Sequence, residues 1–310
     1  MKEEARSIFP EAGVAEGDHF HRTLISMKPC AIPKRLPPKF PRDDVPNCMK
    51  IHPSAIVHPD AQLADDVEVQ AFSIIGPLVK IGAGTVVGSH CVIEGDTVIG
   101  ERTRFFSGAQ IGILSQDLKH DQRLPGRTII GNDSTFREFV TLTSSTMESE
   151  ADYERATTIG DDCLLMSYVH VGHDCHVGNT VILASYVGLS GHVTVGNNVN
   201  MGGMTGVHQD VQVGDFSFLS GHSRVVKDPA PYMVVEGNPC RCHGPNSIGL
   251  ERNGFDKAAR KRIKEMYKIV YRSSLNTTQA LDEIERSVDE SEERDHFVGF
   301  VRQSVRGIIQ

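Results

Sequence analysis

Hydrophobic residues recur every six positions along most of the chain from Ile51 onward. A glycine commonly follows the aliphatic residue, as in Ile75-Gly76 and Ile99-Gly100. Because six is even, each repeat keeps the in-and-out alternation of a β-strand in phase, whereas a helix of about 3.6 residues per turn loses it. The pattern predicts short strands joined by bends, in units that open at Ile51, Val57, Leu63, Val69, Ile75, Ile81, Val87, Ile93 and Ile99, then at Ile130 and Phe136, and finally at Ile159, Leu165, Val171, Val177, Leu183, Leu189, Val195, Met201, Val207, Val213, Leu219 and Val225.

Three such units form one coil of eighteen residues, so stacked coils bring each residue beside the one eighteen positions further on, about 4.8 Å away. The aliphatic residues then line the interior. A β-sandwich is the alternative, but it rarely keeps one six-residue register over a dozen units. The sequence therefore predicts a mainly β protein with a parallel β-helix over 49–228. Similarity to known hexapeptide-repeat proteins implies that the coil is left-handed.

The repeat breaks twice, at 113–129 and at 143–158. Both segments are polar and rich in charge, so we expect loops that project from the wall of the β-helix. Loops held on a rigid scaffold commonly carry functional sites.

The C-terminal part follows a different pattern. We expect 229–255 to be a connector and 256–310 to be a helical domain. Asp256 is a suitable N-cap for the first helix. Further apolar residues at helical spacing predict helices from about Thr278 and about Glu292.

The first 48 residues form a proline-rich N-terminal extension without usable periodicity. Acidic residues such as Glu3, Glu4, Glu11 and Glu16 argue against a transit peptide. The sequence leaves open whether this extension has a role.

Composition narrows the class of protein. Hydrophobic residues make up 39% of the chain, which is enough for a packed core. A formal charge of −8 argues against non-specific nucleic-acid binding. No apolar run approaches the ~20 residues that cross a bilayer. Seven cysteines without regular spacing indicate reduced thiols, so we expect a cytoplasmic protein without a transmembrane segment.

The candidate chemistry lies in a group of histidines. The units that carry His173, His192 and His208 open eighteen residues apart, so these imidazoles should lie along one edge. A histidine at a turn often serves only to form a hydrogen bond with the backbone. Three stacked imidazoles add little stability in that way, and they repel one another when protonated. Two functional hypotheses remain open. The imidazoles hold Zn²⁺ with a free position for water, as in a zinc hydratase, or one of them acts as a general base. Asp174 follows His173 directly and can orient it if the chain bends there.

Several strings make the chain from Met49 onward resemble the acyl-carrier-protein–UDP-N-acetylglucosamine O-acyltransferases of lipid A biosynthesis. They are IHPSAIVHPDA, SQDLKH, LLMSYVHVGHDC, ILASYVGLSGHVTV, GGMTGVHQ and GPNSIGLERNGF. The resemblance implies an enzyme that needs no metal and no cofactor. It also implies a homotrimer with active sites between neighbouring subunits.

The resemblance also implies roles for single residues. His173 removes the proton from the sugar 3-hydroxyl, which attacks the thioester of a 3-hydroxyacyl chain on acyl carrier protein. Asp174 orients His173, and the Gly191 N–H stabilises the oxyanion. Gly221 falls where the family measures acyl length and leaves room for a long chain, which Phe218 narrows. The implied substrate contacts are Gln116, Asp117, Lys119, His170, His192, His208, Gln209, Asn246 and Arg252.

The chain departs from the family where sugar recognition is expected. The family string HRGT is here Thr143-Ser144-Ser145-Thr146, and Ile248 and Asn253 replace Glu and Arg. A different nucleotide amino sugar is therefore an alternative substrate, and an inactive binding module is an alternative of another class. Acyl carrier protein is acidic, so we expect it to dock on the basic residues of the first tail helix, which are Lys257, Arg260, Lys261, Arg262 and Lys264.

Overall fold

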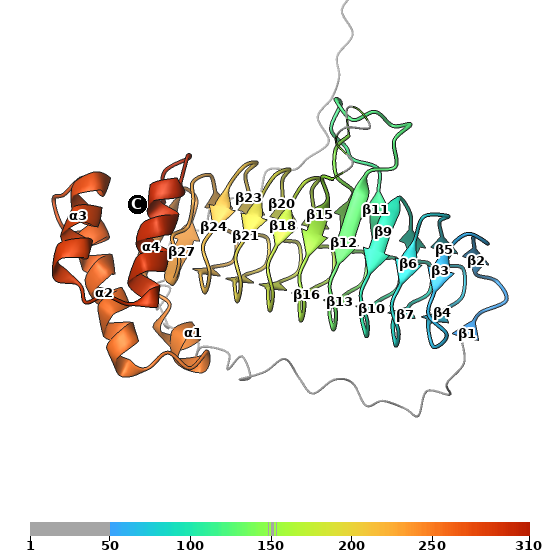
Figure 1. Cartoon of the computed structure of the whole chain (residues 1–310), viewed down its shortest axis with the longest axis horizontal. Coiled ribbons are helices and arrows are strands. Elements are labelled where there is room, and N and C mark those ends of the chain that lie inside the picture. Colours follow the sequence, from blue (N-terminus) through green and yellow to red (C-terminus); the bar gives the residue numbers. More distant parts are fainter. Residues whose placement is uncertain (1–49, 148, 150–151, 153) are drawn as a thin grey trace, which may run out of the picture. The chain divides into compact units, whose positions relative to one another are not determined.

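A computed structural model describes residues 50–147, 149, 152 and 154–310, so the expected extension over 1–48 lies outside the described residues. Three sheets make up the repeat region (Figure 1). Sheet A runs in the order β1 (Lys50–Ile51), β4 (Glu68–Val69), β7 (Val86–Val87), β10 (Arg104–Phe105), β13 (Thr135–Phe136), β16 (Leu164–Leu165), β19 (Ile182–Leu183), β22 (Asn200–Met201), β25 (Phe218–Leu219), β27 (Met233–Gly237) and β28 (Cys240–Pro245). Sheet B runs in the order β2 (Ile56–Val57), β5 (Ile74–Ile75), β8 (Val92–Ile93), β11 (Gln110–Ile113), β14 (Thr141–Thr143), β17 (His170–Val171), β20 (Gly188–Leu189), β23 (Gly206–Val207) and β26 (Arg224–Val225). Sheet C runs in the order β24 (Gln212–Val213), β21 (Thr194–Val195), β18 (His176–Val177), β15 (Thr157–Ile159), β12 (Arg127–Ile130), β9 (Asp96–Ile99), β6 (Lys80–Ile81) and β3 (Gln62–Leu63).

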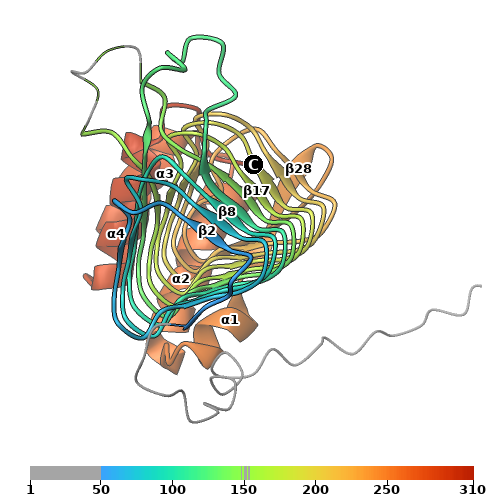
Figure 2. The same ribbon diagram turned by 90° about the vertical axis from the view of Figure 1, so that its right-hand side faces the viewer.

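The strand register has the expected period of eighteen residues. Val69 pairs with Val87, and Val171 pairs with Leu189, in parallel strands of consecutive coils. Viewed along the strand stack, the three sheets form the sides of a triangular prism (Figure 2). The predicted left-handed parallel β-helix is therefore confirmed. The β-helix also contains units that open at Phe105 and Ile111, whereas the sequence pattern predicted no unit between those of Ile99 and Ile130.

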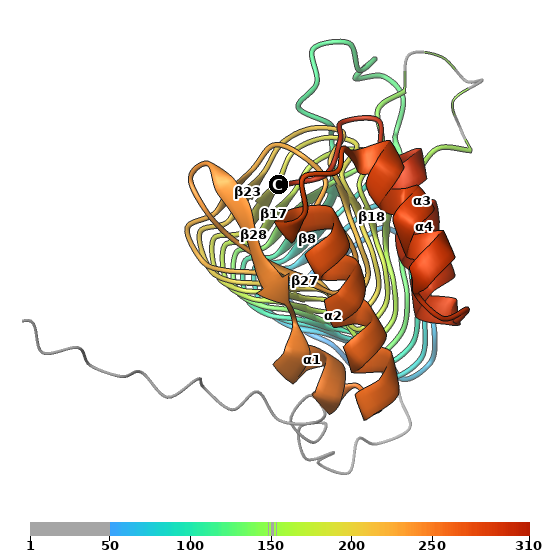
Figure 3. The same cartoon turned by 90° about the vertical axis from the view of Figure 1, so that its left-hand side faces the viewer.

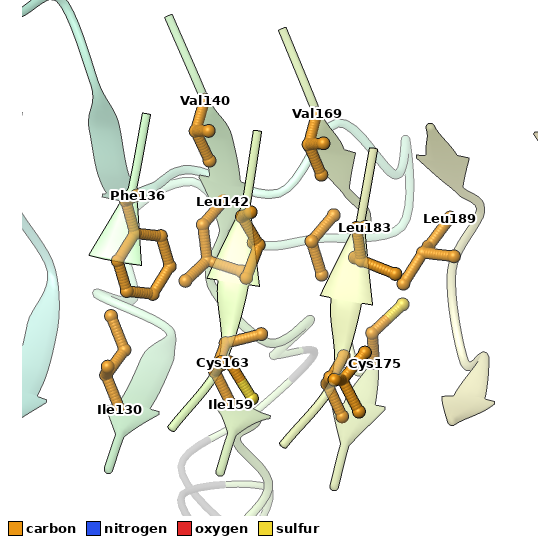
Figure 4. Packing of buried hydrophobic residues seen from close by; sticks show 14 of the residues in the cluster. Ile130, Phe136, Val140, Leu142, Ile159, Cys163, Val169, Cys175, Leu183 and Leu189 are labelled. Atoms are coloured by element: carbon orange, nitrogen blue, oxygen red, sulfur yellow. The ribbon is translucent and has the colours of Figure 1, made fainter. Parts of the chain in front are cut away.

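The residues that open the units point into the prism and form its core. Phe136, Leu142 and Leu189 are fully buried there, and Figure 4 shows such side chains meeting between the strands. Burying one side chain of this kind stabilises the fold by about 1.5–3 kcal/mol. The first coil of the described residues is less buried, since 40% of Ile51 is exposed and Val57 and Leu63 are half-buried.

Polar residues at the edge between sheets C and A stabilise the bends. The Asp161 N–H donates to Asn179 Oδ1 at 2.8 Å, and the Asn179 N–H donates to Asn197 Oδ1 at 2.9 Å. The Asn197 N–H continues the ladder to Asp215 Oδ1 at 2.8 Å. A carboxylate or amide side chain at each bend thus satisfies a backbone donor of the previous coil, which accounts for the asparagines and aspartates of the repeat.

The strands extend into both of the expected loops. Ile113 and Arg127 belong to β11 and β12, so the first loop spans 114–126. Thr143 ends β14 and Thr157 begins β15, which shortens the second loop to 144–156. Each loop leaves a strand of sheet B and returns to a strand of sheet C. Both therefore project from one edge of the prism, which we call the B–C edge (Figure 2).

The expected connector contains regular structure. β27 extends sheet A, β28 pairs with it in antiparallel fashion, and α1 (Ser247–Arg252) follows. The tail helices are α2 (Lys257–Arg272), α3 (Thr277–Ser287) and α4 (Glu292–Gln303), and they share a second apolar core (Figure 3). Asp256 caps α2 by accepting from the Ala259 N–H at 2.7 Å. No helix in the described part of the chain is long and apolar enough to span a membrane.

Candidate active site

The B–C edge brings His173 together with both loops. His173 lies in the bend between β17 and β18, one coil after the bend that carries the second loop. The next residue, Asp174, has a φ of 56°, in the left-handed region. This bend turns two neighbouring side chains toward each other, which an extended strand would point to opposite faces.

His173 and Asp174 form a hydrogen-bonded pair. The His173 Nδ1 atom lies 2.9 Å from Asp174 Oδ2, and only 6% of the Asp174 side chain is exposed. Asp174 Oδ2 also accepts from the Thr146 N–H at 3.0 Å. A carboxylate at Nδ1 holds the proton there and leaves Nε2 free to accept one. The pair therefore has the arrangement of an oriented general base.

Thr146 and Ser115 are functional candidates that the sequence interpretation did not include. Thr146 Oγ1 lies 3.0 Å from His173 Nδ1 and 3.1 Å from Ser115 Oγ. Ser115 in turn accepts from the Asp117 N–H at 3.2 Å. These contacts connect the first loop to the inner nitrogen of His173. The sequence signal for Thr146 is the threonine that closes both the family string HRGT and the string TSST of this chain.

A depression of about 320 Å³ opens above His173 Nε2. Asp117 Oδ2 lies 3.8 Å from that nitrogen, and the Lys119 N–H lowers the pKa of the Asp117 carboxyl. Burial lowers the pKa of His170, whose Nδ1 lies 2.8 Å from Thr141 Oγ1. The depression thus combines an anionic carboxylate with imidazoles, and it is lined by Gln116, Asp117, Thr143, His170, Gly172, His173, Ser190, Gly191 and Gln209.

Gly191 packs directly against the base. A Cβ atom built on this glycine would lie 2.4 Å from ring atoms of His173, which is shorter than real Cβ contacts. Within the described part of the chain, the Gly191 N–H donates to no backbone oxygen. Only glycine leaves room for the imidazole here, and Gly191 lines the depression at His173.

The other residues expected at the site fall into two groups. His192 is exposed beside His173, with ring centroids 5.1 Å apart. His208 is exposed in a bend at the B–C edge, and Lys119 is exposed on the first loop. Asn246 and Arg252 belong to α1 instead. Asn246 caps that helix and donates from Nδ2 to the Phe216 carbonyl at 2.8 Å, at the edge between sheets C and A.

The two residues expected to measure acyl length also lie elsewhere in this chain. Phe218 is on β25 of sheet A, and Gly221 is at the edge between sheets A and B. Neither lines the depression at His173. One copy of the chain therefore does not assemble every residue that the resemblance assigns to the site.

The trio of imidazoles expected for zinc does not form. Among the described residues, the cluster with ligand atoms within 4.8 Å of one another consists of His173, Asp174 and His192. His208 is not part of it, and its Nδ1 lies 3.1 Å from the Gln209 carbonyl. His173 Nδ1 and Asp174 Oδ2 are already bonded to each other, so this geometry favours the general base over the His₃ zinc site.

Comparison with known proteins identifies the family. Residues 228–309 match the family described as Udp N-acetylglucosamine O-acyltransferase, domain 2, and 156–191 match the bacterial transferase hexapeptide repeats. An acyl-[acyl-carrier-protein]–UDP-N-acetylglucosamine O-acyltransferase from Syntrophobacter fumaroxidans is 43% identical over 263 residues, which is 84% of this chain and all of that protein. One from Thermodesulfovibrio yellowstonii is 36% identical over 84% of this chain and 99% of that protein.

Solved structures agree with these sequence matches. LpxA from Acinetobacter baumannii has a TM-score of 0.80 at 37% identity, covering 84% of this chain and 99% of that one. The UDP-N-acetylglucosamine acyltransferase of Arabidopsis has a TM-score of 0.73 at 31% identity, covering 84% of this chain and all of that one. The resemblance stated from the sequence strings is thus confirmed. The chain belongs to the acyl-[acyl-carrier-protein]–UDP-N-acetylglucosamine O-acyltransferase family.

Proposed function

We propose that this protein transfers a 3-hydroxyacyl chain from acyl carrier protein to the 3-hydroxyl of UDP-N-acetylglucosamine, in the cytoplasm, as the first step of lipid A biosynthesis. The observation that carries the proposal is the buried His173–Asp174 pair, whose free nitrogen faces a polar depression. The names of the relatives support the two substrates.

The pair supports a mechanism with one base. His173 Nε2 takes the proton of the sugar 3-hydroxyl while the oxygen attacks the thioester carbonyl, and Asp174 stabilises the resulting imidazolium. The Gly191 N–H donates to the oxyanion of the tetrahedral intermediate. When the C–S bond breaks, the thiolate of the carrier takes the proton from His173, and the neutral imidazole is restored.

The first loop is suited to hold the sugar nucleotide. Asp117 and Gln116 line the depression, and Lys119 is exposed beside them. A carboxylate and an amide can bond sugar hydroxyls, and a lysine can act as a mobile point charge for the diphosphate. His170, His192 and Gln209 would complete the sugar pocket from the wall of the prism.

A homotrimer would complete the site with residues of a neighbouring copy. Asn246, Arg252 and Gly221 lie away from His173 within one chain, so a second copy would have to supply them. The edge between sheets A and B offers an apolar surface for such an assembly. Phe139, Tyr168 and Tyr186 stack there with ring centroids about 5 Å apart, and Met204 is exposed at the same edge in the next coil.

Acyl carrier protein is expected to dock on the lysines of α2. Arg262 and Arg260 face Glu293 and Glu251. The lysines at 257, 261, 264 and 268 are exposed along one face of the helix, where Lys261 Nζ lies 3.7 Å from Glu265. Reversing two charges, with Lys257→Glu and Lys264→Glu, should raise KM for acyl carrier protein by roughly tenfold at low salt, with kcat unchanged. The matched control is Lys80→Glu on β6. An equal KM for both variants in steady-state assays would remove this docking surface.

Thr146→Val is expected to lower kcat about fivefold, the effect of losing one hydrogen bond worth about 1 kcal/mol. The change removes the hydroxyl at His173 Nδ1 but keeps the backbone bond to Asp174. KM for the sugar nucleotide should stay the same, because Thr146 does not line the depression. Thr146→Ser should restore the rate. A valine variant with full kcat would show that this hydroxyl does not position the base.

The direct test is an assay of the purified protein with UDP-N-acetylglucosamine and 3-hydroxyacyl carrier proteins, with the product identified by mass spectrometry. A second candidate substrate, another nucleotide amino sugar, is favoured by Thr143, which lines the depression where the family has an imidazole. Both nucleotide sugars should be compared at equal concentration. Absence of product with either sugar would leave the binding module as the remaining interpretation.

A further inference from the structure

His120 is a buried side chain on the first loop that the proposed mechanism does not use. It ends the string SQDLKH, and the resemblance assigned no role to it. Only 6% of it is exposed. Its Nδ1 atom accepts from the Met147 N–H of the second loop at 3.0 Å, whereas Nε2 is buried without a hydrogen-bond partner among the described residues. The imidazole therefore makes its one side-chain hydrogen bond through an unprotonated Nδ1 that reaches across to the other loop.

Met147 is bonded to the first loop in both directions. Its N–H donates to His120, and its carbonyl accepts from the Asp121 N–H at 2.8 Å. Met147 is itself buried, with 2% exposed. We call these two bonds, formed by His120, Asp121 and Met147, the loop joint. The loops cannot move apart here without breaking both bonds.

The loop joint fixes the backbone of Thr146. The Thr146 N–H donates to Asp174 Oδ2 at 3.0 Å. The next N–H along the chain, that of Met147, donates to His120. Because the peptide groups on both sides of Thr146 are bonded, its φ and ψ are both restrained, and with them the direction of its Cβ atom. That direction keeps Thr146 Oγ1 at 3.0 Å from His173 Nδ1.

His120 is also tied to the residues proposed to hold the sugar nucleotide. Its N–H donates to the Asp117 carbonyl at 3.1 Å and closes a turn that contains Lys119. Asp117 Oδ2 lies 3.8 Å from His173 Nε2. A shift of His120 therefore moves both the sugar side of the site and the hydroxyl beside the base.

We propose that His120 is a positioning residue, which joins the two loops so that the sugar nucleotide and His173 are held in one geometry. This inference rests on the proposed function. His120 does not line the depression at His173, so it acts through Asp117 and Thr146. Restraint of this kind matters because a misplacement of about 1 Å at a reacting group lowers a rate by about 10²-fold.

The test compares His120→Phe with His120→Asn. Phenylalanine keeps a ring but removes the acceptor for Met147, and the loss of Nε2 breaks no bond among the described residues. We expect His120→Phe to lower kcat about fivefold and to raise KM for UDP-N-acetylglucosamine about fivefold, with KM for acyl carrier protein unchanged. Asparagine places an oxygen where Nδ1 lies, so His120→Asn should restore both values.

The matched control is His58→Phe in the first coil. His58 Nδ1 also accepts from a backbone N–H, that of Asp60 at 3.2 Å, but this bond joins no loops. Its kinetics should be those of the wild-type protein. Equal losses in His120→Phe and His120→Asn overturn the inference, because the acceptor would then not be what matters.

A double variant tests whether His120 acts on kcat through Thr146. The kcat of H120F/T146V should equal that of the single variants, because each change already disrupts the same contact with His173. If the double variant instead loses the product of the two separate factors, the inference is overturned, since the two residues would act independently.

Limited trypsin digestion provides a readout that does not depend on activity. Arg123 lies on the first loop with 89% of its side chain exposed. Cleavage after Arg123 should be faster in His120→Phe than in His120→Asn, His58→Phe or the wild-type protein. The melting curve should stay the same, because opening of a loop leaves the core of the prism intact.

The outcomes separate this inference from the proposed function. Wild-type kinetics and cleavage in His120→Phe overturn the inference and leave the proposed function intact. Absence of product from the wild-type protein with either nucleotide sugar overturns the proposed function, and the digestion then still decides whether His120 joins the loops.

Discussion

Replacing His173 with alanine is expected to lower kcat by about 10²–10⁴-fold, the usual contribution of a positioned general base. The imidazole carries the free nitrogen that faces the depression, and no other imidazole in the described residues is bonded to a buried carboxylate in this way. KM for UDP-N-acetylglucosamine should change little, because Gln116, Asp117 and the backbone remain. Steady-state kinetics with saturating acyl carrier substrate measure both parameters.

Asp174→Asn provides the matched comparison for His173→Ala. It keeps the shape of the partner but removes the charge that stabilises the imidazolium, so its kcat should fall between the wild-type and His173→Ala values. Full activity of His173→Ala would refute the mechanism. Loss of activity on chelation, with stoichiometric zinc bound to the wild-type protein, would instead support the zinc alternative.

Replacing Gly191 with alanine is expected to lower kcat by about 10²-fold, because a misplacement of about 1 Å at a reacting group has an effect of this size. The new Cβ atom would lie 2.4 Å from the His173 ring and must push it away. Moving the ring weakens its bond to Asp174 and carries Nε2 away from the sugar. The new methyl group also crowds the N–H assigned to the oxyanion.

Gly299→Ala on α4 is the control for Gly191→Ala. It adds the same methyl group where nothing lies within 4 Å, so activity should stay at the wild-type level. Melting curves of both variants separate a local displacement from unfolding. A Gly191→Ala protein with wild-type kcat would show that His173 tolerates the movement and that its close contact with Gly191 does not contribute to catalysis.

Local features of the sequence were enough to predict the fold, whereas His173 as the candidate base came from the resemblance to the family. Because six is even, the repeat keeps every opener on the inner face of the prism, as the buried Ile75 and Leu165 show. Asp256 likewise caps α2 through contacts within one turn. The pattern missed the units at Phe105 and Ile111, although both side chains face inward like the openers that were predicted.

The arrangement of the site depended on contacts between distant segments. Thr146 reaches His173 from 27 residues away, because the second loop and the bend that carries His173 lie at the same edge in consecutive coils. Asn246 and Gly221 lie away from that edge, which no spacing along the chain reveals.

The sequence by itself therefore determined the repeat and its buried face, since these depend on neighbours within a few residues, while the choice of His173 as the candidate base rested on the resemblance to the family. Only the tertiary structure decided which side chains surround His173, among them Thr146 and Ser115. The stacking of coils sets these lateral contacts. Each loop lengthens the stretch of sequence between stacked residues, so the spacing along the chain does not reveal which residues meet.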